Sequence, residues 1–317
     1  MSETKKFNGV ASGTAPVRDY EYSVISGTIE NNFPETYKVT YTGAEVKNQG
    51  NWPTCVGNAM ATVLEAWIQK TLGKDILISE NFNYGALRKN AALIEGMYHY
   101  EALQMQCQIG SVPKDMYNVY LPMPELFYEI NKLEGLFETA KQYKFANFVK
   151  LNNNDTRTGG KKDLEIKDAL TKYNVPLFCI SPSYFGGSHA IVIVGWDDTK
   201  NSYIIKNSWG EAYGSNGDGT ARIPKSEIRE VYLCLWEPIE LPFNDVTKDD
   251  WFYDDLKSAY LAGVINGKTE TTFDPHAPIT RAEAAVMMSR LMKKIDTAIE
   301  TFNDILRMEL KYAEYND

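Results

Sequence analysis

Three residue types that can together cleave an acyl bond lie far apart in this chain of 317 residues. Cys55 begins one apolar stretch, His189 begins a second, and Asn207 follows a third. A thiol attacks a carbonyl carbon well only as a thiolate, so it needs a base that takes its proton and a third group that orients the base. Because the cysteine, histidine and asparagine can fill these roles, the sequence predicts nucleophilic catalysis at Cys55.

The nucleophile is predicted to lie at the N-terminus of a helix that ends near Gly73. The apolar side chains that follow Cys55 recur at helical spacing and are expected to bury one face of the helix. They are Val56, Ala59, Met60, Val63, Leu64 and Trp67. The N–H groups and the dipole at a helix N-terminus favour a negative sulfur, and a neighbouring imidazolium lowers the pKa of a thiol further.

The histidine and the asparagine are predicted to lie at the ends of two buried strands. The apolar run 190–194 follows His189 directly, and the run 203–205 precedes Asn207 after a polar turn over 197–201. An asparagine amide can accept a hydrogen bond from one ring nitrogen and leave the other nitrogen facing the sulfur.

Two further side chains fit the same chemistry. The side-chain amide of Gln49, with the backbone N–H of Cys55, can donate to the oxyanion that forms when the carbonyl becomes tetrahedral. Removal of one such donor typically costs ~10²–10³ in rate. Trp209 is a bulky ring that can shield the bond between His189 and Asn207 from water, which would strengthen that bond.

At these residues the sequence resembles the papain-like cysteine peptidases. The pair Gln49-Gly50 precedes the cysteine, and the motif Asn-Ser-Trp-Gly is complete at 207–210. His189 and Asn207 follow the cysteine at the spacing of ~130–150 residues that is known for this family. The resemblance implies a two-lobed α+β fold, with a helical lobe led by Cys55 and a β-rich lobe that carries the histidine and the asparagine.

The same resemblance implies the roles of four residues and the reaction. Cys55 is the expected nucleophile, His189 the base, Asn207 the orienting residue and Gln49 the oxyanion donor. The implied reaction is hydrolysis of a protein or peptide substrate through a thioester, with no metal and no organic cofactor. Only three histidines are present and no pair of cysteines has metal-ligand spacing, which also argues against a zinc site.

The sequence departs from the family pattern near the nucleophile. The family usually has a disulfide-forming cysteine three residues before the nucleophile and a tryptophan directly after it, whereas this chain has Trp52 and Val56 there. The other cysteines, Cys107, Cys179 and Cys234, are predicted to be buried free thiols. The stretch before Phe33 is shorter than the family's inhibitory propeptide, so we expect either another means of control or a pro-region outside this sequence.

After Leu241-Pro242 the character of the sequence changes. A short helix is expected over 251–261 and a glycine-centred turn over 263–267. Thr280 and Glu283 form a capping box that opens a second helix through Met292. In the preceding region, helices are expected over 96–112, 126–144 and 164–173.

The order of motifs in this C-terminal part resembles an S-layer homology repeat. The motifs are Phe-x-Asp-Val, Trp, Ala-Gly-Val-Ile-x-Gly, Phe-x-Pro and Ile-Thr-Arg-Ala-Glu. The resemblance implies binding of a bacterial secondary cell-wall polysaccharide, an anionic glycan. Arg281 would contact the glycan acid and Trp251 would offer an apolar face to the sugar; the alternative for Arg281 is a salt bridge at the helix end.

These observations divide the chain into four expected segments. An N-terminal extension covers 1–32, the papain-like domain 33–240, and the S-layer homology repeat 241–297. The last segment, 298–317, is expected to be a truncated second repeat, because Phe302-Asn303-Asp304-Ile305 repeats the start at Phe243-Asn244-Asp245-Val246.

Composition narrows the setting. The net charge of −9 argues against a nucleic-acid partner, and no apolar stretch approaches the ~20 residues of a membrane span. The N-terminus lacks the apolar core of a secretory signal, whereas the C-terminal repeat favours an extracellular or cell-wall location in a bacterium. Two alternatives to a wall-tethered peptidase stay open: a catalytically inactive wall-binding protein, and a peptidoglycan peptide hydrolase, from which the Asn-Ser-Trp-Gly motif leans away.

Overall fold

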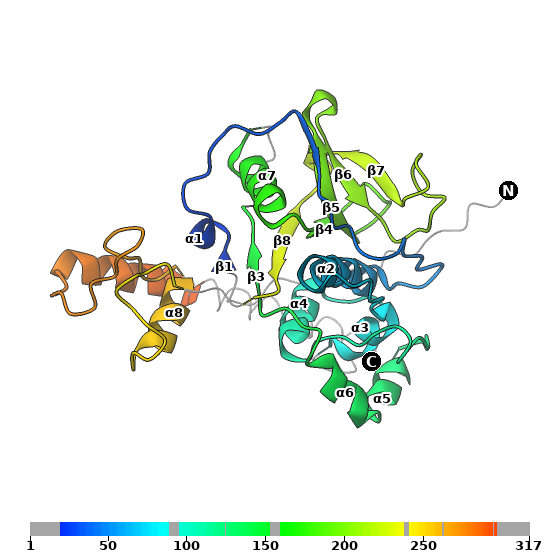
Figure 1. Cartoon of the computed structure of the whole chain (residues 1–317), viewed down its shortest axis with the longest axis horizontal. Helices are drawn as coiled ribbons and strands as arrows, with labels where there is room; N and C mark the ends of the chain where they lie inside the picture. Colours follow the sequence, from blue (N-terminus) through cyan, green and yellow to red (C-terminus); the bar gives the residue numbers. More distant parts are fainter. Residues whose placement is uncertain are drawn as a thin grey trace, which may run out of the picture. The chain divides into compact units, whose positions relative to one another are not determined.

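The computed structural model describes residues 20–88, 95–123, 125–152, 159–237, 241–261, 263–293 and 295–296. These residues fall into two compact units (Figure 1). The larger unit contains the described residues from 28 to 237, and the smaller contains 20–27 together with those from 241 onward.

The helical part of the larger unit is built around the helix that Cys55 begins. Its members are α2 (Cys55–Leu72), α3 (Glu80–Ala86), α4 (His99–Gln108), α5 (Glu125–Asn131) and α6 (Glu134–Ala140). The prediction for α2 is confirmed, including its end at Gly73, whose left-handed φ of 62° lets its N–H bond to the carbonyl of Gln69.

The expected burial of only one face of α2 is wrong. The helix is buried on all sides from Cys55 to Ile68, including its polar residues Asn58 and Glu65. The reason is its central position, because α2 contacts α3 and α4 as well as strands of the sheet. A helix between two layers has no face left for water.

The single helix expected over 126–144 is also wrong, because two short helices occupy this region. The N–H groups of Lys132 and Leu133 bond to the carbonyls of Glu129 and Ile130, three residues back. This tighter turn ends α5 before α6 begins.

The sheet of the larger unit is antiparallel, and α7 (Lys161–Tyr173) packs against β4 and β5 (Figure 1). Its strands run in the order β3-β8-β4-β5-β6-β7, and β2 also pairs with β5. They are β2 (Thr36–Lys38), β3 (Asn147–Lys150), β4 (Leu177–Ser181), β5 (His189–Asp197), β6 (Ser202–Lys206), β7 (Thr220–Pro224) and β8 (Glu230–Leu235). Short 3₁₀ turns at Asp198–Lys200 and Lys225–Glu227 follow β5 and β7.

Strand β5 lies at the centre of this sheet and every residue in it is buried. It pairs with β6 so that Val192 lies opposite Lys206, the last residue of β6. Because the two strands run antiparallel, the residue that follows β6 is brought to the end of β5 where His189 lies. The predicted strands at 190–194 and 203–205 are therefore confirmed, and their pairing explains how His189 and Asn207 meet.

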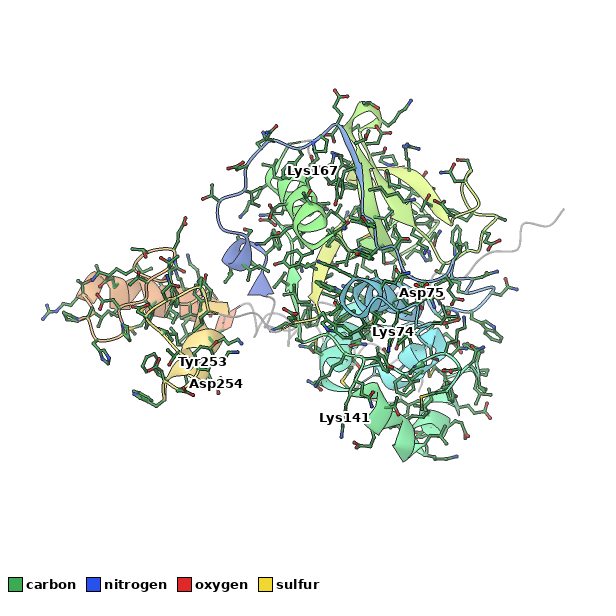
Figure 2. All side chains as sticks on the ribbon, viewed as in Figure 1. Lys74, Asp75, Lys141, Lys167, Tyr253 and Asp254 are labelled. Carbon is green, nitrogen blue, oxygen red and sulfur yellow. The ribbon has the colours of Figure 1, made fainter. Side chains whose placement is uncertain are left out.

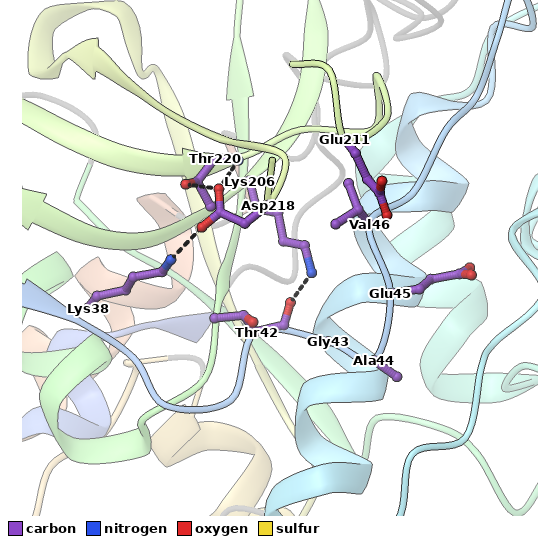
Figure 3. Close-up of a pocket in the computed structure, with 10 residues that line it drawn as sticks. All are labelled: Lys38, Thr42, Gly43, Ala44, Glu45, Val46, Lys206, Glu211, Asp218 and Thr220. Carbon is purple, nitrogen blue, oxygen red and sulfur yellow. Dashed lines mark hydrogen bonds and ion pairs between the residues drawn. The ribbon is translucent and has the colours of Figure 1, made fainter. Parts of the chain in front are cut away.

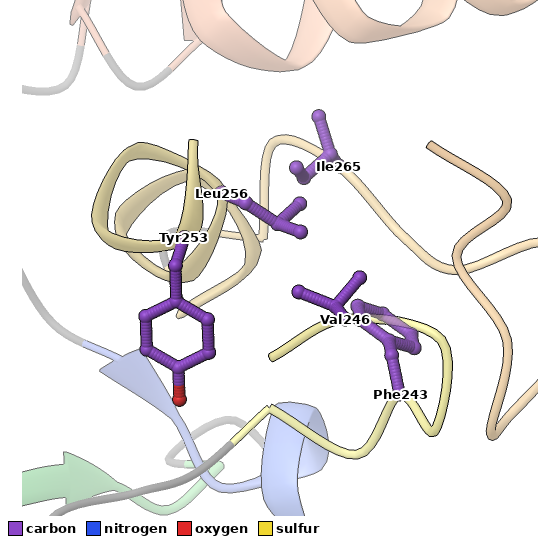
Figure 4. Close-up of a cluster of buried hydrophobic side chains, with 5 residues drawn as sticks. All are labelled: Phe243, Val246, Tyr253, Leu256 and Ile265. Atoms are coloured by element: carbon purple, nitrogen blue, oxygen red, sulfur yellow. The ribbon is translucent and has the colours of Figure 1, made fainter. Parts of the chain in front are cut away.

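The smaller unit has a compact apolar core. The side chains of Phe243, Val246, Leu256 and Ile265 converge there, with the ring of Tyr253 beside them (Figure 4). Tyr253 and Asp254 begin α8 (Tyr253–Leu261), as Figure 2 shows. The unit also contains β1 (Tyr20–Glu21) and α1 (Ser23–Ser26), and the hydroxyl of Tyr260 donates to the carbonyl of Val24 at 3.0 Å.

The predicted capping box of the smaller unit is confirmed. The N–H of Glu283 bonds to Thr280 Oγ1 at 3.1 Å, and the N–H of Thr280 bonds to Glu283 Oε2 at 2.8 Å. A helix follows over 281–293. The predicted second repeat over 298–317 lies outside the described residues. Among the described helices, none is both long and apolar enough to cross a membrane.

Candidate active site

The clearest feature of the site is a buried hydrogen bond between His189 and Asn207. Nε2 of the histidine lies 2.8 Å from Oδ1 of the asparagine, and both residues are buried. The backbone N–H of Ser208 also bonds to Oδ1 at 2.8 Å. Since a backbone N–H can only donate, this oxygen is an acceptor and Nε2 of His189 must carry the proton. Nδ1 of the neutral ring then has the lone pair that a general base needs.

Aromatic rings surround this histidine. The ring centroids of Phe185 and Trp209 lie 4.9 and 5.1 Å from that of His189, and Tyr213 packs edge-on against Trp209 at 5.5 Å. The sequence predicted Trp209 in this position but missed Phe185 and Tyr213. The aromatic pair at 184–185 just before the histidine is the signal that would have suggested the former. These rings keep water from the bond to Asn207 and so strengthen it.

Burial also changes the pKa of the tyrosine in this aromatic cluster. It raises the pKa of Tyr213, while a hydrogen bond with the side chain of Asn207 acts in the opposite direction. The phenol therefore stays protonated at neutral pH and adds no negative charge beside the histidine.

Cys55 is the first residue of α2 and is fully buried. Its position at the helix N-terminus confirms the predicted element and places the thiol near the positive end of the helix dipole. The turn that enters the helix is fixed by Asn58, whose Nδ2 donates to the carbonyl and the hydroxyl of Thr54 at 2.9 and 3.0 Å. This contact between i and i+4 was not foreseen, although Asn and Thr are residues that bond locally near helix starts.

Gln49 is tied to the segment that carries Asn207. Its Oε1 accepts a hydrogen bond from Ser208 Oγ at 2.6 Å, and its backbone N–H donates to the carbonyl of Ser208 at 2.8 Å. Its Nε2 donates to the carbonyl of Trp52 at 2.8 Å. The two bonds to the side chain fix the plane of the Gln49 amide. Sequence reasoning missed Ser208, the second residue of the Asn-Ser-Trp-Gly motif.

Hydrogen bonds therefore connect three of the predicted site residues, and the fourth, Cys55, is close to Gln49 in sequence. His189 bonds to Asn207, Ser208 links the asparagine segment to Gln49, and Cys55 follows Gln49 by six residues. Such a set can deprotonate a thiol, hold the resulting imidazolium and offer N–H donors to an oxyanion.

The other two predicted site residues, Trp251 and Arg281, lie in the smaller unit. Trp251 is 91% exposed, and Arg281 is exposed in the first turn of the helix over 281–293. No ion pair within the described residues involves Arg281, so the alternative of a salt bridge at the helix end gains no support there.

A polar pocket of about 490 Å³ lies elsewhere in the larger unit (Figure 3). Lys206 donates to the carbonyl of Thr42 at 2.9 Å, and Lys38 pairs with Asp218 at 3.0 Å. Burial lowers the pKa of Lys206. The lining does not include the predicted catalytic residues, so we assign it no part in the chemistry. Over the described part of the chain, no three His, Cys, Asp or Glu residues are grouped as metal ligands.

Two family models match this chain. Residues 164–230 match the papain family cysteine protease model, and residues 242–285 match the S-layer homology domain model. The two matched segments lie on either side of the boundary between the two units.

Three curated relatives match parts of this chain. Papain from Carica papaya is 24% identical over 230 residues, which are 67% of this chain and 62% of papain. Cathepsin K from Mus musculus is 26% identical over 182 residues, 54% of each protein. An endoglucanase of Bacillus sp. (strain KSM-635) is 35% identical over 78 residues, 25% of this chain and 7% of that enzyme. The chain thus covers less than two thirds of each of these relatives.

Solved structures establish the fold. Xylellain, a cysteine protease from Xylella fastidiosa, superposes with a TM-score of 0.59 at 18% identity and covers 75% of this chain and 98% of its own. Digestive procathepsin L2 from Tenebrio molitor has a TM-score of 0.55 at 15% identity, with 73% and 78% covered. The larger unit therefore has the predicted two-lobed α+β fold.

Proposed function

We propose that this papain-like cysteine peptidase with a C-terminal S-layer homology domain hydrolyses peptide bonds through Cys55, His189 and Asn207. The observation that carries the proposal is the buried 2.8 Å bond from His189 Nε2 to Asn207 Oδ1. It holds the ring in one tautomer and leaves Nδ1 as the base, which is what activation of a thiol requires.

The proposed reaction has two halves. His189 takes the proton of Cys55, and the thiolate attacks the scissile carbonyl carbon to form a tetrahedral oxyanion. The imidazolium then gives its proton to the leaving amine as the C–N bond breaks, which leaves a thioester. In the second half His189 takes a proton from water, the hydroxide attacks the thioester, and the thiolate leaves as the acid product forms.

Gln49 is the proposed side-chain donor to both oxyanions. Its amide plane is held by Ser208 on one side and by the carbonyl of Trp52 on the other. A donor that is oriented before the substrate arrives needs no reorganisation during the reaction, and this makes it effective. The backbone N–H of Cys55 is the proposed second donor.

A thiol-directed epoxide tests this proposal on the reduced full chain. We expect one adduct on Cys55 in the wild type and none in His189→Ala. Intact mass spectrometry counts the adducts, and peptide mapping identifies the labelled residue. The other thiols serve as internal controls, because burial raises the pKa of Cys107 to about 12 and raises those of Cys179 and Cys234. They should stay unlabelled at neutral pH. Equal labelling of several cysteines, or no adduct, would favour the alternative that the protein is a catalytically inactive wall-binding protein.

Substrate class is separated by two assays. Turnover of casein supports a peptidase that acts on proteins, whereas turnover of muropeptides alone would support a peptidoglycan peptide hydrolase. The Asn-Ser-Trp-Gly motif at 207–210 favours the former.

We also propose that the smaller unit tethers the enzyme to a bacterial cell wall by binding an anionic glycan. The match to an S-layer homology domain and the exposure of Trp251 and Arg281 support this location and these two residues. Guanidinium suits a carboxylate, and an indole face suits a sugar ring. Co-sedimentation with purified walls should weaken in Trp251→Ala and Arg281→Ala. Lys268→Ala removes the same charge from an exposed ion pair with Asp274 and should not change binding.

A further inference from the structure

An exposed tryptophan, Trp52, lies three residues before the proposed nucleophile and pairs with the half-buried ring of Tyr120. Trp52 is 48% exposed, and the centroid of its ring lies 3.6 Å from that of Tyr120 at an interplanar angle of 33°. The backbone of Trp52 belongs to the turn that holds the oxyanion donor, since its N–H bonds to the carbonyl of Gln49 at 3.1 Å and its carbonyl accepts from Gln49 Nε2 at 2.8 Å. The ring and the proposed catalytic machinery therefore share one short turn.

Contacts with Tyr84 and Glu95 fix the position of Tyr120. Its ring stacks on Tyr84 at 6.2 Å, and both hydroxyls bond to Glu95 Oε2, at 3.4 Å from Tyr120 and 2.7 Å from Tyr84. The other oxygen of Glu95 accepts from the N–H of Met123 at 3.1 Å. Burial raises the pKa of Tyr120, and the charge of Glu95 raises it further, so the hydroxyl stays a donor at neutral pH. The aromatic ring that packs against Trp52 is therefore held in place before a substrate binds.

Trp52 is close to the proposed nucleophile along the chain. Three residues span at most ~11 Å between the Cα atoms of Trp52 and Cys55, about the length of three residues of an extended peptide. A half-exposed tryptophan on a rigid support offers a large contact area at a small cost in side-chain entropy, a property typical of recognition surfaces. Glu95 is already occupied by Tyr84, Tyr120 and Met123, so its carboxylate does not favour a cationic ligand.

We propose that Trp52, backed by Tyr120, forms a subsite that selects a large apolar or aromatic side chain of the peptide substrate. This inference rests on the proposed peptidase activity. Trp52 acts here as a specificity residue: its ring contacts a substrate side chain, while its backbone only positions Gln49.

Fluorogenic peptides varied one position at a time test this subsite. For the wild-type full chain, kcat/KM should favour Phe or Leu over Gly at one substrate position. Trp52→Ala should reduce that preference roughly 10-fold or more, since loss of an apolar contact typically changes discrimination by ~10–200-fold. Trp52→Phe should keep most of it. Tyr120→Leu, which leaves the turn of Gln49 unchanged, should weaken the preference at the same position.

The possible outcomes separate the two proposals. Turnover by the wild type with the same side-chain preference in Trp52→Ala would overturn the subsite and leave the peptidase activity standing. An equal loss for all peptides in Trp52→Ala, with Tyr120→Leu unchanged, would mean that Trp52 acts only through the turn. A preference for Arg or Lys that Trp52→Ala abolishes would assign a cationic ligand and overturn the apolar one. No turnover by the wild type, together with no adduct on Cys55, would refute the peptidase proposal itself.

Discussion

Replacement of Ser208 by alanine should lower turnover while leaving the reactivity of Cys55 intact. Ser208 Oγ donates to Gln49 Oε1 at 2.6 Å, and both side chains are buried. The change removes the bond that fixes one end of the Gln49 amide. It leaves the backbone N–H of Ser208, which bonds to Asn207 Oδ1, in place. The bond between His189 and Asn207 should therefore survive.

The size of the effect follows from two limits. A neutral hydrogen bond contributes about 1 kcal/mol, which sets a lower limit of roughly 5-fold on the rate if Gln49 is merely loosened. Complete loss of one oxyanion donor costs ~10²–10³ in kcat. Since the bond from Gln49 Nε2 to the carbonyl of Trp52 remains in Ser208→Ala, we expect a loss of about 10- to 100-fold in kcat with little change in KM.

Two assays on the same protein check this reasoning. Steady-state kinetics with a fluorogenic peptide measures kcat, and the rate of alkylation by a thiol-directed epoxide measures the activated thiolate. Ser202→Ala is the matched control, because Ser202 is also buried and its hydroxyl has no hydrogen-bond partner in the described part of the chain. An unchanged kcat in Ser208→Ala would refute the role given to Gln49. A parallel fall in alkylation would show that the change acts on the Cys–His pair instead.

Three further predictions address the nucleophile, the smaller unit and acid stability. Cys55→Ala should abolish turnover and labelling with a nearly unchanged melting temperature; a large fall would give the thiol a structural role. Gly267→Ala should destabilise the smaller unit by about 1–3 kcal/mol, because an added Cβ would collide with the ring of Phe243, and faster hydrogen exchange over 241–293 should reveal it with peptidase activity unchanged. Burial opposes the charge of Glu230, but His99 and other partners hold its pKa at about 2, below its unfolded value. The stability that this carboxylate contributes is therefore present above about pH 4.5 and lost toward pH 2, and denaturant titrations should show a flatter fall over this range in Glu230→Gln.

Much of the fold around the site follows from local sequence patterns. Helical spacing after Cys55 and the apolar runs after His189 and before Asn207 are short-range signals, and the elements they predict are present. The capping box at Thr280 is equally local, since its two bonds join residues three apart. Signals of this kind need no knowledge of the rest of the chain.

What the sequence did not reveal depends on residues that are distant along the chain. Glu65 lies on α2 at a position that would face water in an isolated helix, yet its side chain is fully buried. Burial raises the pKa of Glu65, and Lys47 compensates by approaching one of its oxygens to 2.6 Å. An ion pair of this kind is formed only when the chain before α2 returns to the helix, and periodicity carries no trace of that.

The candidate site shows the same division between local and distant causes. Each proposed catalytic residue could be named because its neighbours in sequence indicate its element. The residue that holds Gln49 in place could not be named, because Ser208 bonds to Gln49 across 159 positions of the chain. The sequence motif indicates which groups react, whereas the topology of the fold decides which residues position them.

The turn before Cys55 carries both a proposed catalytic residue and a proposed specificity residue. One short segment supplies the donor of Gln49, the ring of Trp52 and the start of α2, so that a substrate side chain on the ring would also bear on the turn that orients the donor. All four cysteines are free thiols, so no disulfide braces this turn. Hydrogen bonds of Gln49 to Ser208 and to the carbonyl of Trp52 hold it instead. Selection of the substrate and stabilisation of the oxyanion are therefore expected to be coupled: a good side chain at Trp52 should raise kcat as well as lower KM.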